Sequence, residues 1–282
     1  MRWLCLLLAL IAVPAFATPR VVALDWASGE TALALGVVPV GFAQIPDYRI
    51  WSGDMPMPAA VVDVGLRMEP NLELIRALRP DLILIAPLQA TLRPQLARIA
   101  PVQVVTFNDA QQPDGYLQAK LATRELAVRL GRSAAAEALI AQSDAALASL
   151  GRQLHGAPPL YLLRFADRRH AWVLGRQSLF GGALAAAGVP LAMQEATNTW
   201  GFSNLPLTDL AKVPEAQILY IDPLPFADLS VLDDNQLWRQ LPAVQAGRVL
   251  GLPAVWLGNG LPSVLRFSQL LAERWPNPQE AG

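Results

Sequence analysis

Residues 134–150 read AAAEALIAQSDAALASL and lie near the middle of a chain of 282 residues. Alanine and leucine dominate this stretch, and the wider span 116–154 contains no proline. The high helix propensity of these residues predicts a helix of about 20 residues, about 30 Å long. Such a helix can be an ordinary packed helix or a rigid strut between two lobes. The sequence on either side of it favours the strut.

On both sides of this helix, short apolar runs alternate with helical stretches. In the first half, strands are predicted at 20–24, 37–42, 82–85 and 102–107, and helices at 30–35, 71–78 and 92–99. In the second half, strands are predicted at 160–165, 171–174, 218–221 and 249–252, and helices at 178–187 and 261–271. This alternation is typical of a parallel α/β sheet. The predicted fold is α/β, with two lobes, each a mainly parallel sheet flanked by helices, joined by one long helix.

The N-terminus has the pattern of a cleavable secretory signal. Arg2 precedes an apolar run at 3–13 that is too short to span a bilayer, and small residues stand before the expected cleavage after Ala17. The alternative is a buried N-terminal helix. The predicted division is a signal peptide at 1–17, an N-terminal lobe at 18–131, a linking helix at 132–156 and a C-terminal lobe at 157–282. The mature chain is expected in the periplasm.

The composition argues against several kinds of protein. Hydrophobic residues make up 53% of the chain and charged residues 16%, which is not the pattern of a disordered chain. A formal net charge of −1 argues against nucleic acid as a partner. Two histidines and one cysteine leave few soft metal ligands, which argues against structural zinc, iron–sulfur clusters and most histidine-based catalysis. Since the sequence contains no phosphate-binding loop, dinucleotide glycine motif or nucleophile elbow, we do not expect an enzyme.

Four tryptophans stand in segments expected to be loops. Trp26 follows the first predicted strand, Trp51 lies in the turn-rich segment 47–58, and Trp200 and Trp256 lie in loops of the second half. Each alone could be a core residue. Together they suggest aromatic walls for a bulky ligand, because the carboxyl ends of the strands face the ligand crevice in α/β sheets. Arg67, between a strand-like run and a helix start, is either a surface residue paired with Glu69 or a donor to anionic oxygens.

Several motifs resemble those of the ferric-hydroxamate siderophore-binding proteins of the bacterial periplasm. They are VALDW (22–26), YRIW (48–51), DVGLRMEPNLEL (63–74), LARIAP (96–101), TNTWG (197–201) and GRVLGLPAVW (247–256). The resemblance covers nearly all of the mature chain. It implies the helix-backbone class of binding protein, with two α/β lobes bridged by one long helix. It also implies that the chain delivers an iron chelate to an ABC importer in the inner membrane. The chain is expected to be a monomer.

The resemblance also implies roles for individual residues. Arg67 corresponds to the arginine that donates to the hydroxamate oxygens, Trp51, Trp200 and Trp256 to aromatic pocket walls, and Trp26 to a further aromatic residue at the cleft. Iron would be bound only as a pre-formed siderophore chelate, so no cofactor and no metal ligand from the protein are expected.

Two positions depart from the family pattern. Gln89 stands where the family has a tyrosine, and its amide could still donate a hydrogen bond to the ligand. Arg164 stands where the family has a small polar residue. If Arg164 faces the cleft, a second cation would favour a more anionic chelate, such as a citrate-based hydroxamate. The alternative is that Arg164 faces outward.

Three different functions remain open at this point. The first is a receptor for haem or a cobalamin, both of them bulky and apolar. Haem usually takes a histidine, tyrosine or methionine ligand, and no histidine is expected at the cleft. The second is an exported α/β enzyme, and the third is a structural or interaction module with the same fold.

Overall fold

The computed structural model of the protein describes residues 18–53, 55–258 and 260–275. The predicted signal peptide at 1–17 and the end of the predicted C-terminal lobe lie outside the described residues. Within the described part, no helix combines the length and the apolar character needed to cross a bilayer.

The first half is built on a five-stranded sheet with the strand order β3-β2-β1-β4-β5. Its strands are all parallel: β1 (Val21–Ala23), β2 (Gly41–Phe42), β3 (Val62–Asp63), β4 (Leu82–Ile85) and β5 (Val102–Val104). Its helices are α1 (Trp26–Ala34), α2 (Ile45–Ser52), α3 (Leu72–Ala77), the 3₁₀ helix η1 (Pro87–Leu92) and α4 (Arg93–Leu96). Short crossovers join each strand to the next. The apolar runs in the sequence are typical of the buried strands of such a parallel sheet.

The second half is built on a five-stranded mixed sheet with the order β10-β9-β6-β7-β8. The strands are β6 (Leu160–Phe165), β7 (His170–Leu174), β8 (Phe202–Pro206), β9 (Gln217–Ile221) and β10 (Val249–Leu252). Its smaller helices are α7 (Leu179–Ala186), η2 (Leu207–Lys212), η3 (Leu229–Leu232), α8 (Gln236–Arg239) and α9 (Pro242–Gln245). β7 is antiparallel to β6 and β8, because a tight turn joins β6 to β7, with Asp167 Oδ1 accepting from the backbone nitrogen of His170 at 2.8 Å.

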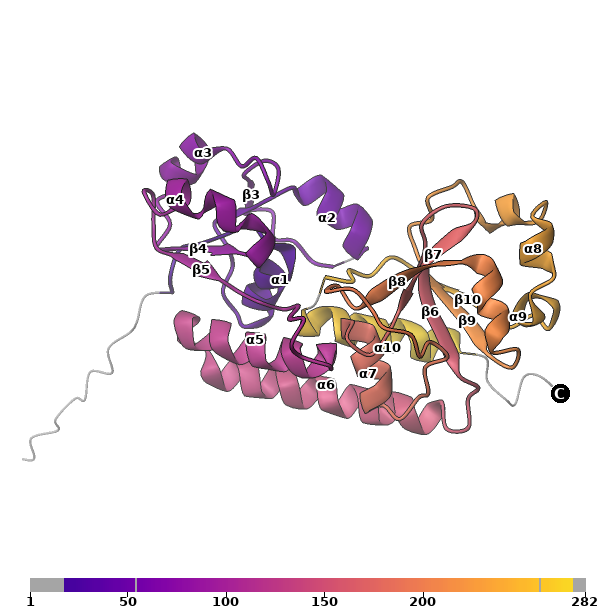
Figure 1. The fold of residues 1–282 in the computed structure, drawn as a ribbon. Helices are drawn as coiled ribbons and strands as arrows, with labels where there is room; N and C mark the ends of the chain where they lie inside the picture. The colour runs from indigo at the N-terminus through magenta and orange to yellow at the C-terminus, as the bar shows by residue number, and fades with distance from the viewer. Residues whose placement is uncertain (1–17, 54, 259, 276–282) are drawn as a thin grey trace, which may run out of the picture.

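Three long helices connect the halves. They are α5 (Gly115–Leu130), α6 (Ser133–Gln153) and α10 (Leu261–Arg274). The stretch 134–150 forms a helix as predicted, and α6 runs beneath both halves (Figure 1). α10, from the other end of the chain, packs along α6, and Gln153 Nε2 donates to the Ala272 carbonyl at 2.8 Å. The predicted long helix is therefore present, and α5 and α10 pack against it where it joins the halves. The division into lobes at the predicted boundaries stays a prediction.

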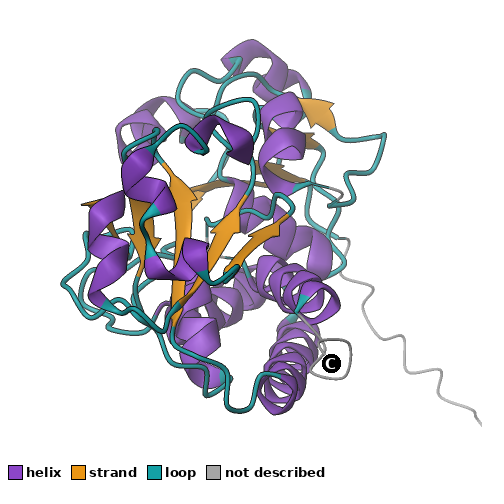
Figure 2. Cartoon of the chain, turned by 90° about the vertical axis from the view of Figure 1, so that its right-hand side faces the viewer, coloured by secondary structure: helices purple, strands orange, loops and turns teal. Residues whose placement is uncertain are grey.

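The largest hydrophobic core is continuous across the two halves. It joins side chains of β1, β6 and β9 to those of α1, α5, α6, α7 and α10. Two smaller clusters cover the outer faces of the first and second sheets. Figure 2, which views the long helices nearly end-on, shows strands with helices packed on both sides.

Several predicted elements have different limits in the structure. The helix predicted at 30–35 begins at Trp26, because the Asp25 carboxylate caps it by accepting from the Ser28 backbone nitrogen at 2.9 Å. The strand predicted at 37–42 is reduced to β2. The helix predicted at 92–99 becomes η1 followed by the short α4.

The segment around Trp51 is a helix rather than the predicted turn-rich loop. α2 begins after Gln44, which has a left-handed backbone with φ of 58°. Its first turn is capped from β3: Asp63 accepts from the backbone nitrogens of Gln44 and Ile45, both at 3.2 Å. Since this cap is about 18 residues away in sequence, the local pattern does not reveal it.

Candidate ligand-binding site

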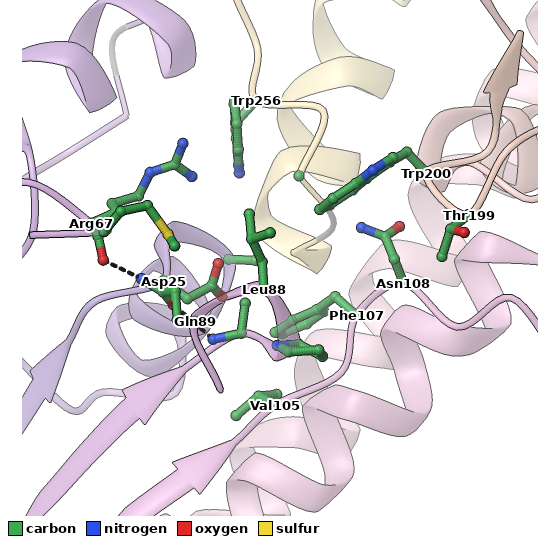
Figure 3. Close-up of a pocket in the computed structure, with 15 residues that line it drawn as sticks. Asp25, Arg67, Leu88, Gln89, Val105, Phe107, Asn108, Thr199, Trp200 and Trp256 are labelled. Carbon is green, nitrogen blue, oxygen red and sulfur yellow. Dashed lines mark hydrogen bonds between the residues drawn. The ribbon is translucent and has the colours of Figure 1, made fainter. Parts of the chain in front are cut away.

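A cavity of about 230 Å³ lies between the two halves. The first half supplies loops after β1, β3, β4 and β5, and the second half supplies the segments before β8 and after β10 (Figure 3). Its lining residues are Asp25, Ala27, Arg67, Met68, Ala86, Pro87, Leu88, Gln89, Val105, Phe107, Asn108, Thr199, Trp200, Trp256 and Gly258. Of the residues predicted to bind ligand, this cavity brings together Arg67, Gln89, Trp200 and Trp256.

Arg67 presents a cation with free donors to this cavity. It lies in the loop between β3 and α3, which turns at Gly65 with φ of 89°. Its guanidinium carbon lies 4.0 Å from the ring centroid of Trp26 and 5.6 Å from that of Trp256. Within the described part of the chain its guanidinium forms no ion pair, and its buried Nε has no hydrogen-bond partner. The alternative pairing with Glu69 is therefore not formed.

Burial lowers the pKa of Arg67, and the nearby carboxylates of Asp25 and Asp47 act in the opposite direction. The group stays a cation at neutral pH, since the ordinary pKa of arginine is far above 7. A partly buried guanidinium with unused donors fits an anionic or strongly polarised oxygen.

Gln89 is buried beside Arg67, with 3% of its surface exposed, and holds the Arg67 loop in place. Its Nε2 donates to the backbone carbonyls of Arg67, at 2.8 Å, and Leu24, at 3.0 Å, while its Oε1 accepts from the Ala86 backbone nitrogen at 2.8 Å. Both amide hydrogens are thus used within the protein. The donation to ligand expected from the sequence would require breaking one of these bonds.

Trp26 is buried next to Arg67 and Trp256 and does not line the cavity. The side chain is 1% exposed, and its Nε1 donates to the Ala43 carbonyl at 2.8 Å. Its ring packs edge-on against Tyr48 and Trp256, with centroid distances of 5.5 and 4.7 Å. Trp26 therefore helps to position Arg67 and Trp256 through contacts of its ring.

The other two lining tryptophans reach the cavity from the second half. Trp256 Nε1 is buried without a hydrogen-bond partner among the described residues, which leaves a second free donor in the wall. Trp200 is 50% exposed, and its turn is fixed by Asn198 Oδ1, which accepts from the Trp200 backbone nitrogen at 2.9 Å. With the exposed side chains of Met68 and Leu88, Trp200 forms an apolar rim around the cavity.

Trp51 and Arg164 pair with each other and do not line this cavity. Arg164, on β6 of the second half, places its guanidinium carbon 4.1 Å from the ring centroid of Trp51, on α2 of the first half. Arg164 thus faces the first half, not outward to solvent. Its Nη2 donates to the Pro223 carbonyl at 2.9 Å, and burial lowers its pKa to about 10.

Some lining residues that were not predicted from the sequence follow β5 and β1. Phe107 and Asn108 lie just beyond the carboxyl end of β5, and Asp25 lies just beyond β1. Burial raises the pKa of Asp25, although its bonds to Ser28 and the charge of Arg67 act against this. The rule that ligands bind at the carboxyl ends of parallel strands would have indicated these positions.

The described residues include no group of three or more histidine, cysteine, aspartate or glutamate side chains placed to hold a metal ion. In the described part of the chain, the buried unpaired donors of the cavity are Arg67 Nε and Trp256 Nε1, and most of its wall is apolar or aromatic. Such a wall suits a bulky ligand that carries its own oxygen atoms on its surface.

Comparison with known proteins gives matches over most of the chain. A family profile described as periplasmic binding protein matches residues 21–255. A curated relative, the iron(3+)-hydroxamate-binding protein FhuD of Escherichia coli K12, is 37% identical over 254 residues, which cover 89% of this chain and 85% of the relative.

Solved structures share the same architecture. The siderophore-binding protein FhuD from Vibrio cholerae, solved with bound Fe³⁺–Desferal, superposes with a TM-score of 0.85 at 33% identity, covering 92% of this chain and 98% of that one. The petrobactin-binding protein YclQ from Bacillus subtilis gives a TM-score of 0.72 at 18% identity, covering 91% of both chains. The second likeness concerns the fold alone.

Proposed function

We propose that the chain, which belongs to the periplasmic binding protein family, binds a ferric hydroxamate siderophore between its two halves and passes it to an ABC importer. The E. coli relative is named for ferric hydroxamate binding, and the V. cholerae structure contains ferric Desferal. A haem receptor, a cobalamin receptor and an enzyme are not favoured by these relatives.

The observation that carries the proposal is the guanidinium of Arg67, without an ion pair among the described residues, beside the buried and equally unpaired Nε1 of Trp256. A hexadentate chelate satisfies the coordination of ferric iron by itself, but its hydroxamate oxygens remain partly anionic and accept hydrogen bonds. Two free donors supply these bonds, and aromatic surface covers the organic scaffold. Iron is then cargo within its chelate, and the protein contributes no ligand atom.

The partner and the compartment follow from the same proposal. A binding protein of this family would be exported to the periplasm, act as a monomer and hand its cargo to the inner-membrane permease without catalysing a reaction. The matching family profile, described as periplasmic binding protein, supports the compartment. Purification from the periplasmic fraction, with a mass that matches one chain, would test compartment and monomer together.

Arg67→Gln tests the proposed site directly. The substitution removes the charged guanidinium and leaves a shorter side chain that ends in a neutral amide. Hydrogen bonds to charged groups are worth about 1.5–3 kcal/mol, so we expect affinity for ferric desferrioxamine B to fall at least tenfold. Stability should change little, since Arg67 makes no ion pair among the described residues. Titration followed by tryptophan fluorescence measures the affinity, and urea unfolding measures the stability.

Arg98→Gln is the matched control, because Arg98 is an exposed arginine on the first half, away from the lining residues. It should bind as the wild-type protein does. Equal affinity of the wild-type and Arg67→Gln proteins would contradict the assignment of Arg67. Failure of the wild-type protein to bind any ferric hydroxamate, with binding of haem or cobalamin instead, would contradict the proposed function.

A further inference from the structure

Beside the cavity, the second sheet presents an aromatic and cationic face to the first half. In the register of β6 and β7, Arg164 lies directly opposite Trp172, so both side chains lie on the same face of the sheet. Phe202 on β8 stacks on Trp172, with ring centroids 5.2 Å apart and an interplanar angle of 28°. Across the interface, the ring of Trp51 lies over the Arg164 guanidinium. We call Trp51, Arg164, Trp172 and Phe202 the Arg164 patch.

Among the described residues, the charge of Arg164 lacks an anionic partner in contact with it. The side chain is 4% exposed, yet no carboxylate of that part of the chain lies within 4.0 Å of its guanidinium, and its Nη2 donates to the neutral carbonyl of Pro223. Asp222 attracts it from a greater distance. A buried cation without an anion is costly, and an anion placed beside it would recover part of that cost.

The Arg164 patch and the cavity share two chain segments. On one side, Gly53, two residues after Trp51, approaches the backbone of Ala254 so closely that a β-carbon there would lie 2.7 Å from the Ala254 carbonyl oxygen. Ala254 is two residues before the cavity residue Trp256. On the other side, Phe202 is two residues after the cavity residue Trp200. The patch and the cavity are therefore built on the same chain segments, at the junction of the two halves.

The patch also offers open aromatic surface. Trp172 remains 39% exposed although it is stacked on Phe202. A half-exposed indole beside a buried guanidinium can cover an apolar linker and leave its terminal carboxylate to the cation. Arg67 and Arg164 would then act on different parts of one ligand, from opposite halves of the protein.

We propose that the Arg164 patch is a second subsite, and that it binds a carboxylate on the organic part of the chelate. The preferred cargo is then a ferric hydroxamate that carries a free carboxylate outside the iron coordination sphere. This inference rests on the proposed function and narrows its substrate class.

The test uses two ferric probes that differ only in the pendant group. Desferrioxamine B is acylated at its terminal amine, either with an acetyl group, which is neutral, or with a succinyl group, which ends in a carboxylate. We expect the wild-type protein to bind the succinylated ferric probe about tenfold more tightly than the acetylated one. In Arg164→Gln this ratio should fall to about one, whatever the variant does to the affinity for each probe.

Arg168→Gln is the matched control. Arg168 is exposed in the turn between β6 and β7 and loses the same charge on substitution, so its variant should keep the wild-type ratio. Arg164→Lys keeps a cation and should keep part of the preference.

Each outcome decides the proposal. A ratio near one in the wild-type protein, or an unchanged ratio in Arg164→Gln, would overturn the second subsite and leave the proposed function standing. If Arg164→Gln does not fold, the ratio of the two probe affinities in the wild-type protein decides the proposal by itself. No binding of either probe to the wild-type protein would overturn the proposed function, and this inference with it.

Discussion

At Arg67 the backbone and the side chain are held by different neighbours. The carbonyl of Arg67 accepts from Gln89, and the guanidinium lies over the ring of Trp26. The donors of Arg67 stay free because its charge is positioned by stacking rather than by an ion pair. A site of this kind keeps its geometry while its hydrogen-bonding capacity remains available to a ligand.

Gln89→Leu tests the positioning of this loop at the residue scale. The change removes both donors of Gln89 and leaves the carbonyls of Leu24 and Arg67 without their partner. Leaving one buried polar group unpaired costs about 1–3 kcal/mol, and Gln89 pairs with more than one, so the free energy of unfolding should fall by at least that amount. Affinity for a ferric hydroxamate should fall as well, because the Arg67 loop loses its anchor. Urea unfolding and fluorescence titration provide the two measurements.

Gln95→Leu is the control for this prediction, since Gln95 is exposed on α4 and has no role in the loop. An unchanged unfolding free energy in Gln89→Leu would show that other contacts fix the Arg67 backbone.

Arg67, Trp200 and Trp256 line one cavity, and each lies in a loop with a distinctive local motif, so the sequence could indicate them; their binding role stays a prediction. The sequence did not reveal that Trp26 is buried. The Trp26 ring packs against Tyr48 and Trp256, and its Nε1 donates to the Ala43 carbonyl. The nearest of these partners in sequence is 17 residues away. Burial of a side chain next to a strand end depends on these distant partners, which a local pattern does not contain.

At the scale of elements, α1 and α10 are joined by a buried carboxylate. Glu30 on α1 is 2% exposed, and its Oε1 accepts from Ser263 Oγ at 2.8 Å, in the first turn of α10. Its Oε2 accepts from the Tyr48 hydroxyl at 3.3 Å, which joins α2 to the same group. Glu30 therefore connects the first half to the helix that closes the second.

Stability should depend on pH through Glu30. Burial raises the pKa of Glu30 to about 8 from 4.5, and repulsion by Asp25 acts in the same direction against the bonds from Ser263 and Tyr48. Between these values the folded protein binds a proton that the unfolded chain does not. The free energy of unfolding should thus fall as pH rises from about 4.5 to about 8 and then level off. Each unit of pKa shift corresponds to about 1.4 kcal/mol.

Glu30→Gln separates this contribution from that of other groups, because glutamine cannot titrate. Urea unfolding of both proteins across this pH range should give a difference, wild type minus variant, that declines with pH. Parallel pH profiles would mean that Glu30 does not titrate between these values.

Strong local patterns explain which elements the sequence predicted. The uninterrupted apolar run of β4, the largely apolar run of β6 and the alanine-rich α6 each provide a local signal. β3 and α2 do not, because β3 has two residues and α2 depends on a cap from Asp63. The contact between Glu30 and Ser263 spans 233 residues and has no local signature at all.

At the scale of the whole molecule, one core serves both halves. Side chains from both sheets and from α5, α6, α7 and α10 belong to a single buried cluster. Two lobes joined by a single strut could each have kept a separate core. The packing of α10 onto α6, α5 and α1 removes that independence.

The protein should therefore unfold as one cooperative unit. In calorimetry we expect one transition, with the calorimetric enthalpy equal to the van't Hoff enthalpy. Far-ultraviolet circular dichroism and tryptophan fluorescence should report the same midpoint. Two resolved transitions would instead indicate that each half is stable without the other.

The rim formed by Met68, Leu88 and Trp200 has a practical consequence. Without a bound ligand, these three large apolar side chains at the cavity entrance are exposed to solvent. Patches of this kind promote self-association, and a bound molecule that covers them removes the contact area. At high concentration the ligand-free protein should therefore aggregate earlier than the ligand-bound protein. Light scattering would measure the difference in aggregation.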